Sequence, residues 1–260
     1  MKKTLTLLFA LVMSLSLIVG CSGDKTTMET INKTGEMTFA MTGGYPPFNF
    51  MNEEGELDGF DIDIANALAK EMGVEAVPVT TAWDGIIGGL ISKRFDTIIG
   101  SMAITKDRLE EVNFTNPYYY DGAQFFSKSA STLTDISDLV DGKVGVVTGT
   151  TYFNALSEMD NISEIMQFES DVDNMMALDQ DRIDGLVTGR FVGLQAPEKF
   201  GVDLVPIGEM LYAEEIGIAV RLEDAELLSS MNEALATIIE NGTYEEISNK
   251  WFGTNILEKQ

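Results

Sequence analysis

The chain has 260 residues, of which 45% are hydrophobic, enough to bury a real core in one large domain or two small ones. Its 42 acidic residues against 17 basic ones make nucleic acid and anionic lipid poor partners for the general surface. There is no histidine, only one cysteine, and no phosphate-loop or metal-ligand spacing, which removes most nucleophilic, zinc and nucleotide chemistry, so we expect no catalytic residue, no metal site and no cofactor.

Residues 1–20 have the pattern of a removable signal peptide. Two lysines precede an apolar run from Leu5 to Val19, which is too short and wrongly flanked for a stop-transfer helix. The end of this run resembles the bacterial lipobox, so we expect lipid attachment at Cys21; an ordinary secretory signal is the alternative. Residues 21–35 are predicted to form the lipidated cysteine and a flexible tether.

The next part of the chain predicts an α/β layer. Strand patterns cover 36–42, 75–80 and 96–100, and apolar residues at helical spacing predict helices over 62–72 and 86–91. This alternation of strand and helix favours a mostly parallel sheet.

A second unit of the same kind begins after residue 127. Its predicted strands cover 143–147, 185–188, 204–207 and 216–220, and its helices begin near Tyr152 and Asp171. The last two helices, 225–240 and 244–251, have no sheet of their own, so we expect them to dock on the first unit. The predicted first lobe is therefore discontinuous, over 36–126 and 221–256, and the second lobe covers 127–220.

Several motifs together resemble a known family, the family 3 bacterial extracellular solute-binding proteins, which are the polar amino-acid receptors of ABC importers. The motifs are Tyr45-Pro46-Pro47-Phe48, Gly59-Phe60-Asp61-Ile62-Asp63-Ile64 followed by Leu68-Ala69, Ile104-Thr105 with Arg108, Phe114 with Pro117-Tyr118, and Asn249-Lys250-Trp251-Phe252-Gly253. The similarity covers about residues 36 to 255. It implies a two-lobed fold of the type II periplasmic-binding-protein kind, in which a two-stranded hinge joins two α/β domains and the ligand lies between them.

Arg108 is the predicted anchor for a carboxylate. A planar guanidinium can donate two parallel charge-assisted hydrogen bonds to a carboxylate, and the resemblance implies that it binds the ligand's α-carboxylate. The structural alternative is a surface arginine paired with Glu110 or Glu111 along its own helix.

The turn from Thr148 to Thr151 joins a strand to a helix, where exposed N–H groups and the helix dipole favour an anion. The resemblance implies that Thr148, Thr150 and Thr151 contact the same carboxylate from the second lobe. N-capping by Thr150 or Thr151 is the alternative, and both roles can hold together. Contacts from both lobes would favour the closed state.

Aromatic residues are expected to line the side-chain part of the pocket. Tyr45, Phe48 and Trp83 match wall positions of the family, although Phe48 fits a core position equally well. The remaining ligand-binding positions predicted by the resemblance are Thr42, Gly100, Ser101, Ala103 and Gly189.

The sequence departs from the family pattern at two of these places. Ala103 lacks the hydroxyl commonly found there, and Gly189 stands where an aspartate usually accepts from the ligand's α-ammonium group. A buried ammonium without a carboxylate partner is costly. Three accounts stay open: a ligand without an α-amine, a different acid such as Asp184, Glu214 or Glu215, or a shifted ligand with Arg190 adding positive charge.

The sequence and the resemblance together predict a monomeric, lipid-anchored extracytoplasmic receptor and no enzyme activity. It would capture a small carboxylate-bearing solute, an amino acid or an analogue, by hinge closure and deliver it to an ABC permease. Asp61 and Asp63 are expected to stabilise a helix N-terminus. The alternative is a cyclohexadienyl-dehydratase-like enzyme on the same fold, which an acid or base with a raised pKa in the cleft would favour.

Overall fold

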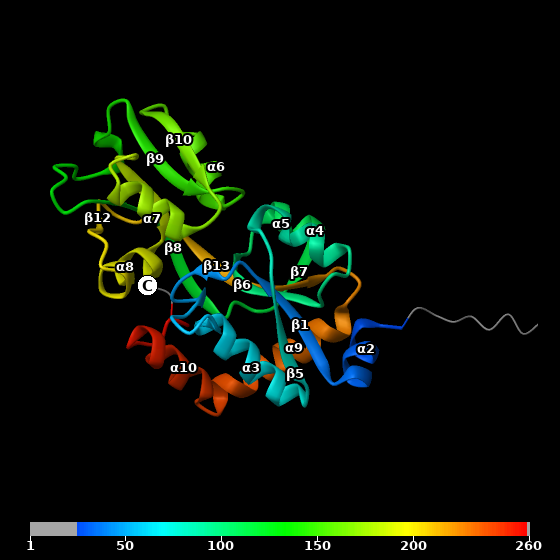
Figure 1. The fold of residues 1–260 in the computed structure, drawn as a ribbon. Helices are drawn as coiled ribbons and strands as arrows, with labels where there is room; N and C mark the ends of the chain where they lie inside the picture. The colour runs from blue at the N-terminus through cyan, green and yellow to red at the C-terminus, as the bar shows by residue number, and fades with distance from the viewer. Residues whose placement is uncertain (1–24, 259–260) are drawn as a thin grey trace, which may run out of the picture.

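The computed structural model describes residues 25–258 and consists of two lobes connected by two long strands, β8 and β13 (Figure 1). A single ten-stranded sheet runs through both lobes in the order β10-β9-β11-β8-β13-β6-β1-β5, with β12 beside β8 and β7 beside β13. Its strands are β1 (Glu36–Met41), β5 (Glu75–Thr80), β6 (Thr97–Ala103), β7 (Val112–Phe114), β8 (Tyr119–Ser127), β9 (Gly142–Val147), β10 (Ile162–Phe168), β11 (Gly185–Gly189), β12 (Val205–Pro206) and β13 (Tyr212–Arg221). A separate small sheet contains β2 (Gly44–Tyr45), β3 (Asn49–Met51) and β4 (Leu57–Asp58).

Helices cover the faces of the large sheet in both lobes (Figure 1). Those of the first lobe are α2 (Thr27–Thr34), α3 (Phe60–Met72), α4 (Ile86–Ile91), α5 (Lys106–Glu111), α9 (Ala225–Glu240) and α10 (Thr243–Phe252). Those of the second lobe are α6 (Thr151–Ser157), α7 (Asp171–Asp179) and α8 (Arg190–Phe200). Two short 3-10 helices cover Trp83–Gly85 and Ile136–Asp138.

Each lobe contains the parallel layer that the sequence predicts. In the first lobe β1 lies between β5 and β6 and runs parallel to both, so that Ala40 stands beside Val79 and Ile98. In the second lobe β9 runs parallel to β10 and β11. The inner strands of both layers are largely buried, because helices pack on both faces, and this explains their nearly continuous apolar sequences.

A two-stranded ribbon connects the lobes. Residues 120–122 of β8 lie antiparallel to 213–215 of β13. Beyond this ribbon β8 pairs with β11 of the second lobe from Ala123 onwards, and β13 pairs with β6 of the first lobe from Ile216 onwards. Within the described residues, the chain therefore passes from one lobe to the other at this ribbon.

The predicted flexible tether is too long, because residues 27–34 form helix α2. Thr26 caps the helix in a reciprocal capping box with Glu29, and Met28 and Ile31 are buried where the helix packs against α9 and β1. The sequence looks polar because only these two side chains face the core. Cys21 and the signal segment lie outside the described residues.

Asp61 and Asp63 in the first turn of α3 make hydrogen bonds to other segments in addition to their interaction with the helix dipole. Asp61 is fully buried and accepts hydrogen bonds from Asn49 Nδ2 at 2.7 Å, Tyr118 Oη at 2.6 Å and Ser101 Oγ at 2.9 Å. Asp63 accepts from Lys250 Nζ and Trp251 Nε1 of α10, both at 2.7 Å. The two aspartates therefore connect α3 to the strands behind it and to the end of the chain.

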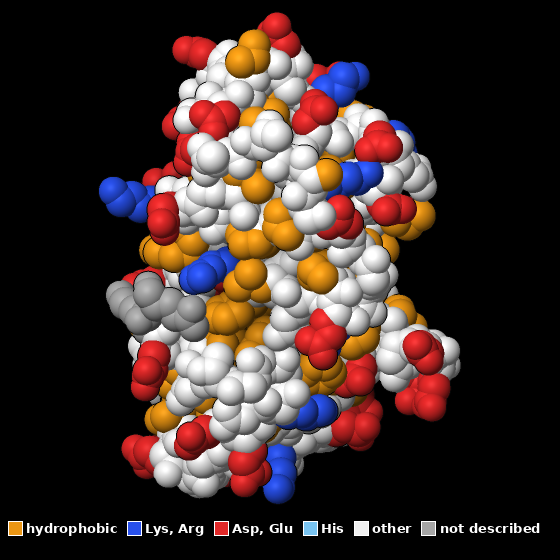
Figure 2. Space-filling model, turned by 90° about the vertical axis from the view of Figure 1, so that its left-hand side faces the viewer, with side chains coloured by type: hydrophobic (Ala, Val, Ile, Leu, Met, Phe, Trp, Pro, Cys, Tyr) orange, Lys and Arg blue, Asp and Glu red, His pale blue; other side chains and the backbone are white. Residues whose placement is uncertain are grey.

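Acidic side chains are spread over both lobes on the face drawn in Figure 2, and hydrophobic side chains gather in a hollow near its middle. This distribution agrees with the strong acidity of the whole chain. Within residues 25–258, none of the helices has both the length and the apolar character that crossing a bilayer requires.

Candidate functional site

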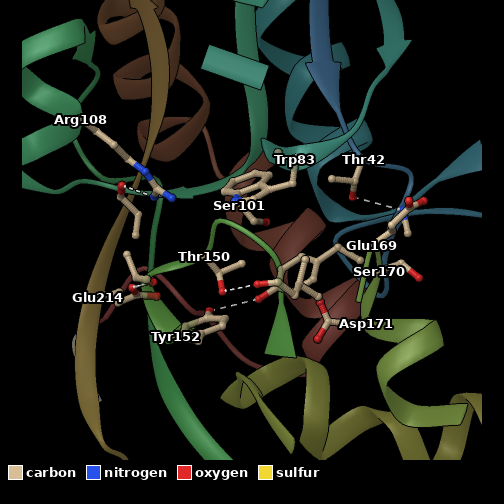
Figure 3. Close-up of a pocket in the computed structure, with 16 residues that line it drawn as sticks. Thr42, Trp83, Ser101, Arg108, Thr150, Tyr152, Glu169, Ser170, Asp171 and Glu214 are labelled. Atoms are coloured by element: carbon tan, nitrogen blue, oxygen red, sulfur yellow. Dashed lines mark hydrogen bonds between the residues drawn. The ribbon is translucent and has the colours of Figure 1, made fainter. Parts of the chain in front are cut away.

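A cavity lies between the two lobes, and about 510 Å³ of space in it, counting the part that is open to solvent, is not filled by protein atoms (Figure 3). Its walls come from Thr42 just after β1, from β2, β6, α5 and the 3-10 helix that begins at Trp83, all in the first lobe. The second lobe contributes the end of β9 and the turns that lead into α6 and α7, and the connecting strand β13 contributes Glu214. The residues that line it are Thr42, Gly44, Tyr45, Trp83, Gly100, Ser101, Ala103, Arg108, Val147, Thr150, Thr151, Tyr152, Glu169, Ser170, Asp171 and Glu214.

Arg108 is directed into this cavity from helix α5. The Thr105 side chain caps that helix, and the Nη1 atom of Arg108 donates to the carbonyl oxygen of Ala103 at 2.9 Å. The guanidinium also lies 5.4 Å from the ring centroid of Trp83, within cation–π range. Burial lowers the pKa of Arg108 and the carboxyl of Glu214 opposes this shift, so the side chain remains a cation. A fixed cation is thus available at one end of the cavity.

The turn before α6 faces Arg108 from the second lobe. Thr150 donates to the carbonyl oxygen of Val147 at 2.8 Å and accepts from Phe153 N at 3.4 Å, so it caps α6. Thr151 donates to Glu214 Oε1 at 2.5 Å. The capping role and a position in the cavity wall therefore occur together in Thr150.

Two hydrogen bonds cross the cavity between the lobes. Trp83 Nε1 donates to the carbonyl oxygen of Gly149 at 3.2 Å, and the hydroxyls of Tyr45 and Tyr152 lie 3.5 Å apart. Figure 3 shows Tyr152 between Glu214 on one side and Asp171 on the other. The lobes are therefore in contact around the site.

The predicted site residues are mostly brought together, with three exceptions. Phe48 is fully buried and stacks on Tyr45 and Tyr119, which makes it a core residue. Thr148 donates to the carbonyl oxygen of Phe168 at 3.3 Å and does not line the cavity. Gly189 lies behind the hydroxyls of Tyr45 and Tyr152.

Sequence reasoning missed several wall residues of the second lobe. Tyr152 follows the threonine turn directly, and Glu169, Ser170 and Asp171 form a polar turn that caps α7, with Ser170 as the cap. In the sequence, the cluster of polar residues between the end of β10 and the start of α7 was the signal that could have indicated a binding turn. Of the three acids that the sequence offers as partners for an ammonium group, Asp184, Glu214 and Glu215, Glu214 is the one that lines the cavity.

Ser101 and Ala103 contribute through their backbone geometry. Ser101 has φ of 61°, its N–H donates to Tyr118 Oη at 3.0 Å, and its hydroxyl donates to Asp61. Ala103 has no side-chain hydroxyl, and it contributes its carbonyl oxygen, which accepts the hydrogen bond from Arg108. The buried Asp61 thus fixes the strand end from which the anchor is positioned.

Four buried carboxyl groups lie around the cavity, and all have raised pKa values. Burial raises the pKa of Asp61 to about 6, that of Asp171 to about 7 and that of Asp121 to about 8. Burial also raises the pKa of Glu214, while Thr151 and Arg108 lower it. Among the described residues no cluster of acidic side chains or cysteine has the arrangement of a metal site.

These carboxyl groups predict how stability depends on pH. Because their pKa values are higher in the folded than in the unfolded chain, the folded state binds more protons between about pH 4 and pH 8. Their contribution to the free energy of unfolding is therefore largest below pH 4 and is lost as the pH rises through 8. We expect the melting temperature of the unliganded protein, measured by calorimetry at constant ionic strength, to fall from pH 5 to pH 8. Asp171→Asn should flatten the fall around pH 7, and a melting temperature that rises throughout would contradict this account.

The arrangement suits a small solute that carries one negatively charged and one positively charged group. Arg108 offers a cation at one end, and the carboxyl groups of Glu169, Asp171 and Glu214 surround the rest of the cavity. Tyr45, Trp83 and Tyr152 supply large rigid surfaces at low entropic cost.

Comparisons with known proteins agree on one family. The sequence profile of the bacterial extracellular solute-binding proteins, family 3, matches residues 37–254. The L-cystine-binding protein TcyJ of Escherichia coli (strain K12) is 32% identical over 253 residues, which are 95% of this chain and 95% of that protein. A histidine-bound substrate-binding protein of an ABC uptake transporter from Streptococcus pneumoniae has a TM-score of 0.85 at 28% identity, over 89% of this chain and 98% of the other. AncCDT-1, an ancestral amino-acid-binding protein and precursor of cyclohexadienyl dehydratase, has a TM-score of 0.81 at 34% identity, over 87% of this chain and 100% of the other.

Proposed function

The chain belongs to the bacterial extracellular solute-binding proteins, family 3, and from this premise we propose that it is the substrate-binding component of an ABC importer for an amino acid or a close analogue. The two-lobed α/β fold predicted from the sequence is confirmed by the solved structures that share it. The proteins it resembles bind cystine, histidine or other amino acids, according to their names.

The position of Arg108 is the observation that carries this proposal. Its guanidinium lies in the cavity between the lobes, opposite the threonine turn, instead of extending along its helix surface. In that place it can bind a carboxylate through charge-assisted hydrogen bonds, shielded from water by Trp83. The ligand-binding residues we propose are those of the predicted set that line the cavity: Thr42, Tyr45, Trp83, Gly100, Ser101, Ala103, Arg108, Thr150 and Thr151.

We propose that binding works by closure about the ribbon of β8 and β13. The first lobe would hold the solute through Arg108 and the second through the turn at Thr150, and the chain would pass between lobes within residues 120–122 and 213–215. A solute that contacts both lobes binds the closed state more tightly than the open one and so shifts the population towards it.

We further propose that the protein acts outside the cytoplasm as a monomer and delivers its solute to an ABC permease. Family membership supports the extracellular location and the transport role. Lipid attachment at Cys21 remains a proposal that rests on the sequence pattern alone.

A thermal-shift screen tests the proposed function. Amino acids, their deaminated analogues and dicarboxylates are each added at saturating concentration, and a ligand at about 100 times its Kd should stabilise the fold by about 2.7 kcal/mol. For a protein of this size that is a rise in melting temperature of roughly 5 to 11 °C. We expect at least one amino acid to produce it, and a screen in which no acid shifts the melting temperature would defeat the proposal.

An enzyme is the second candidate function, because carboxyl groups with raised pKa values line the cavity. Asp171, whose pKa burial raises to about 7, can hold a proton near neutral pH, as a general acid would, and burial raises the pKa of Glu214 as well. Prolonged incubation with a prephenate-like acid and product analysis tests this candidate. Release of a product by the wild type, lost in Asp171→Asn or Glu214→Gln, would support the enzyme, and unchanged substrate would exclude it for that class.

A further inference from the structure

The space for a side chain at position 189 is already occupied by three oxygen atoms. The point where a β-carbon on Gly189 would stand lies 2.3 Å from Tyr45 Oη, 2.8 Å from Asp121 Oδ2 and 3.3 Å from Tyr152 Oη. The backbone of Gly189 has φ of −59°, which any residue can adopt. A side chain at this position would therefore force Tyr45 and Asp121 to move, whereas the chain conformation itself does not call for glycine.

Asp121 is the unusual member of this group. It is only 7% exposed, and neither of its carboxyl oxygens has a hydrogen-bond partner of good geometry among the described residues. The backbone N–H groups of Gly122, Arg190 and Phe191 are directed towards it and partly offset the rise in pKa that burial causes. A buried carboxyl group left in this state is unfavourable, so its presence on β8 needs an explanation.

A second carboxyl group lies directly across the ribbon. Glu214 is the partner of Asp121 in the antiparallel register, is 8% exposed and lines the cavity. Two acids directly opposite each other repel when both are ionised, and Glu214 adds to the raised pKa of Asp121. A positive charge placed beside them would remove this cost.

We propose that the hinge ribbon supplies the negative charge that receives the solute's α-ammonium group, in the role of the side chain absent at Gly189. Glu214 would contact the ammonium directly, and Asp121 would act through the hydroxyls of Tyr45 and Tyr152. A tyrosine hydroxyl can donate its proton to Asp121 and accept from the ammonium with its lone pairs. This inference rests on the proposed function, and it selects an amine-bearing solute from the accounts that the sequence leaves open.

Amine recognition would then lie on β8 and β13, the two strands that connect the lobes. Asp121 and Glu214 belong to the two-stranded section between the lobes, whereas the carboxylate anchor Arg108 belongs to the first lobe. Tyr45 and Tyr152 come from opposite lobes and meet at the hydroxyl pair. An ammonium bound there would hold both lobes and the ribbon together, which favours closure.

The first test measures amine preference. The Kd of the amino acid found by screening and that of its deaminated analogue are measured by calorimetry in the wild type, Asp121→Asn and Glu214→Gln. We expect the amino acid to bind roughly 10- to 100-fold more weakly in each variant, as for a lost hydrogen bond to a charge, while the analogue changes less than about 3-fold. Glu215→Gln is the matched control, because Glu215 is the next residue on the same strand but is exposed.

The second test separates this role from a structural one. At pH 8 the unliganded Asp121→Asn protein should melt at a higher temperature than the wild type, because the variant avoids burying a carboxylate. A structural carboxylate would give the opposite sign. The other titratable groups around Asp121 are Glu214 and the tyrosines 45, 119 and 152, together with Tyr120, Arg190 and Glu215, which line a second cavity with Asp121 and Glu214.

Several results would overturn the inference. Equal weakening of both ligands in Asp121→Asn and Glu214→Gln would do so, as would loss of amine preference only in Asp171→Asn. A wild type that binds deaminated acids alone would refute the inference and leave the proposed receptor function intact. A wild type that binds no acid at all would instead refute the proposed function.

Discussion

Arg108→Ala is expected to weaken binding of the solute by roughly 30-fold to several thousand-fold, the equivalent of about 2 to 5 kcal/mol. The variant removes the cation at one end of the cavity and leaves the solute's carboxylate without its charged donor. It also removes the contact with Trp83 and the hydrogen bond to Ala103. Titration calorimetry with the screened solute measures the effect.

Two further variants make the Arg108 result specific. Arg108→Lys keeps the charge but loses the planar pair of donors, so its affinity should fall between those of the wild type and Arg108→Ala. Lys106→Ala removes a cation from the same helix at an exposed position and should leave the Kd nearly unchanged. If Arg108→Ala bound the solute as the wild type does, the assigned anchor would be wrong.

Arg221→Ala is expected to produce the largest loss of stability. Arg221 is 3% exposed, pairs with Asp224 at 2.7 Å, and donates to the carbonyl oxygens of Leu90 and Phe95 at 3.0 and 2.7 Å. Its removal leaves a buried carboxylate and two carbonyl groups without their donor, which costs about 3 to 5 kcal/mol. For a protein of this size the melting temperature should fall by roughly 6 to 20 °C.

The matched control for Arg221 is Arg94→Ala. Arg94 is exposed in the segment before β6, so its replacement should change stability by no more than about 0.5 kcal/mol. Replacing Arg221 and Asp224 together should cost less than the sum of the single variants, because the buried charge is then also removed. A melting temperature of Arg221→Ala within about 2 °C of the wild type would show that the pair contributes little.

The alternating elements of both lobes were predictable because their periodicity is strong. Residues 75–80, 86–91 and 225–240 have the secondary structure that the apolar spacing indicated. Helix α8 was missed because Gly193 and Pro197 interrupt its pattern, although neither prevents the helix. Helix α2 was missed because burial by α9 and β1, and not its own composition, stabilises it.

The candidate site was predictable only where it follows local motifs. Arg108, Trp83 and Thr150 each come directly after or before a recognisable element, so their places in the cavity follow from the order of the chain. The pairing of Asp121 with Glu214 depends on the register between two strands about ninety residues apart, which no local pattern reveals. The role of Asp61 likewise depends on donors that come from three distant segments.

Helix α2 has a practical consequence for recombinant versions of the protein. Thr27 accepts from Arg221 Nη2 at 3.0 Å and donates to Asp224 at 2.7 Å, so the beginning of the helix completes the buried ion pair. A truncated form that starts at β1 would uncover the core beneath Met28 and Ile31 and leave Arg221 short of an acceptor. Expression designs should therefore begin ahead of the capping residue Thr26, even though the first strand looks like the natural boundary.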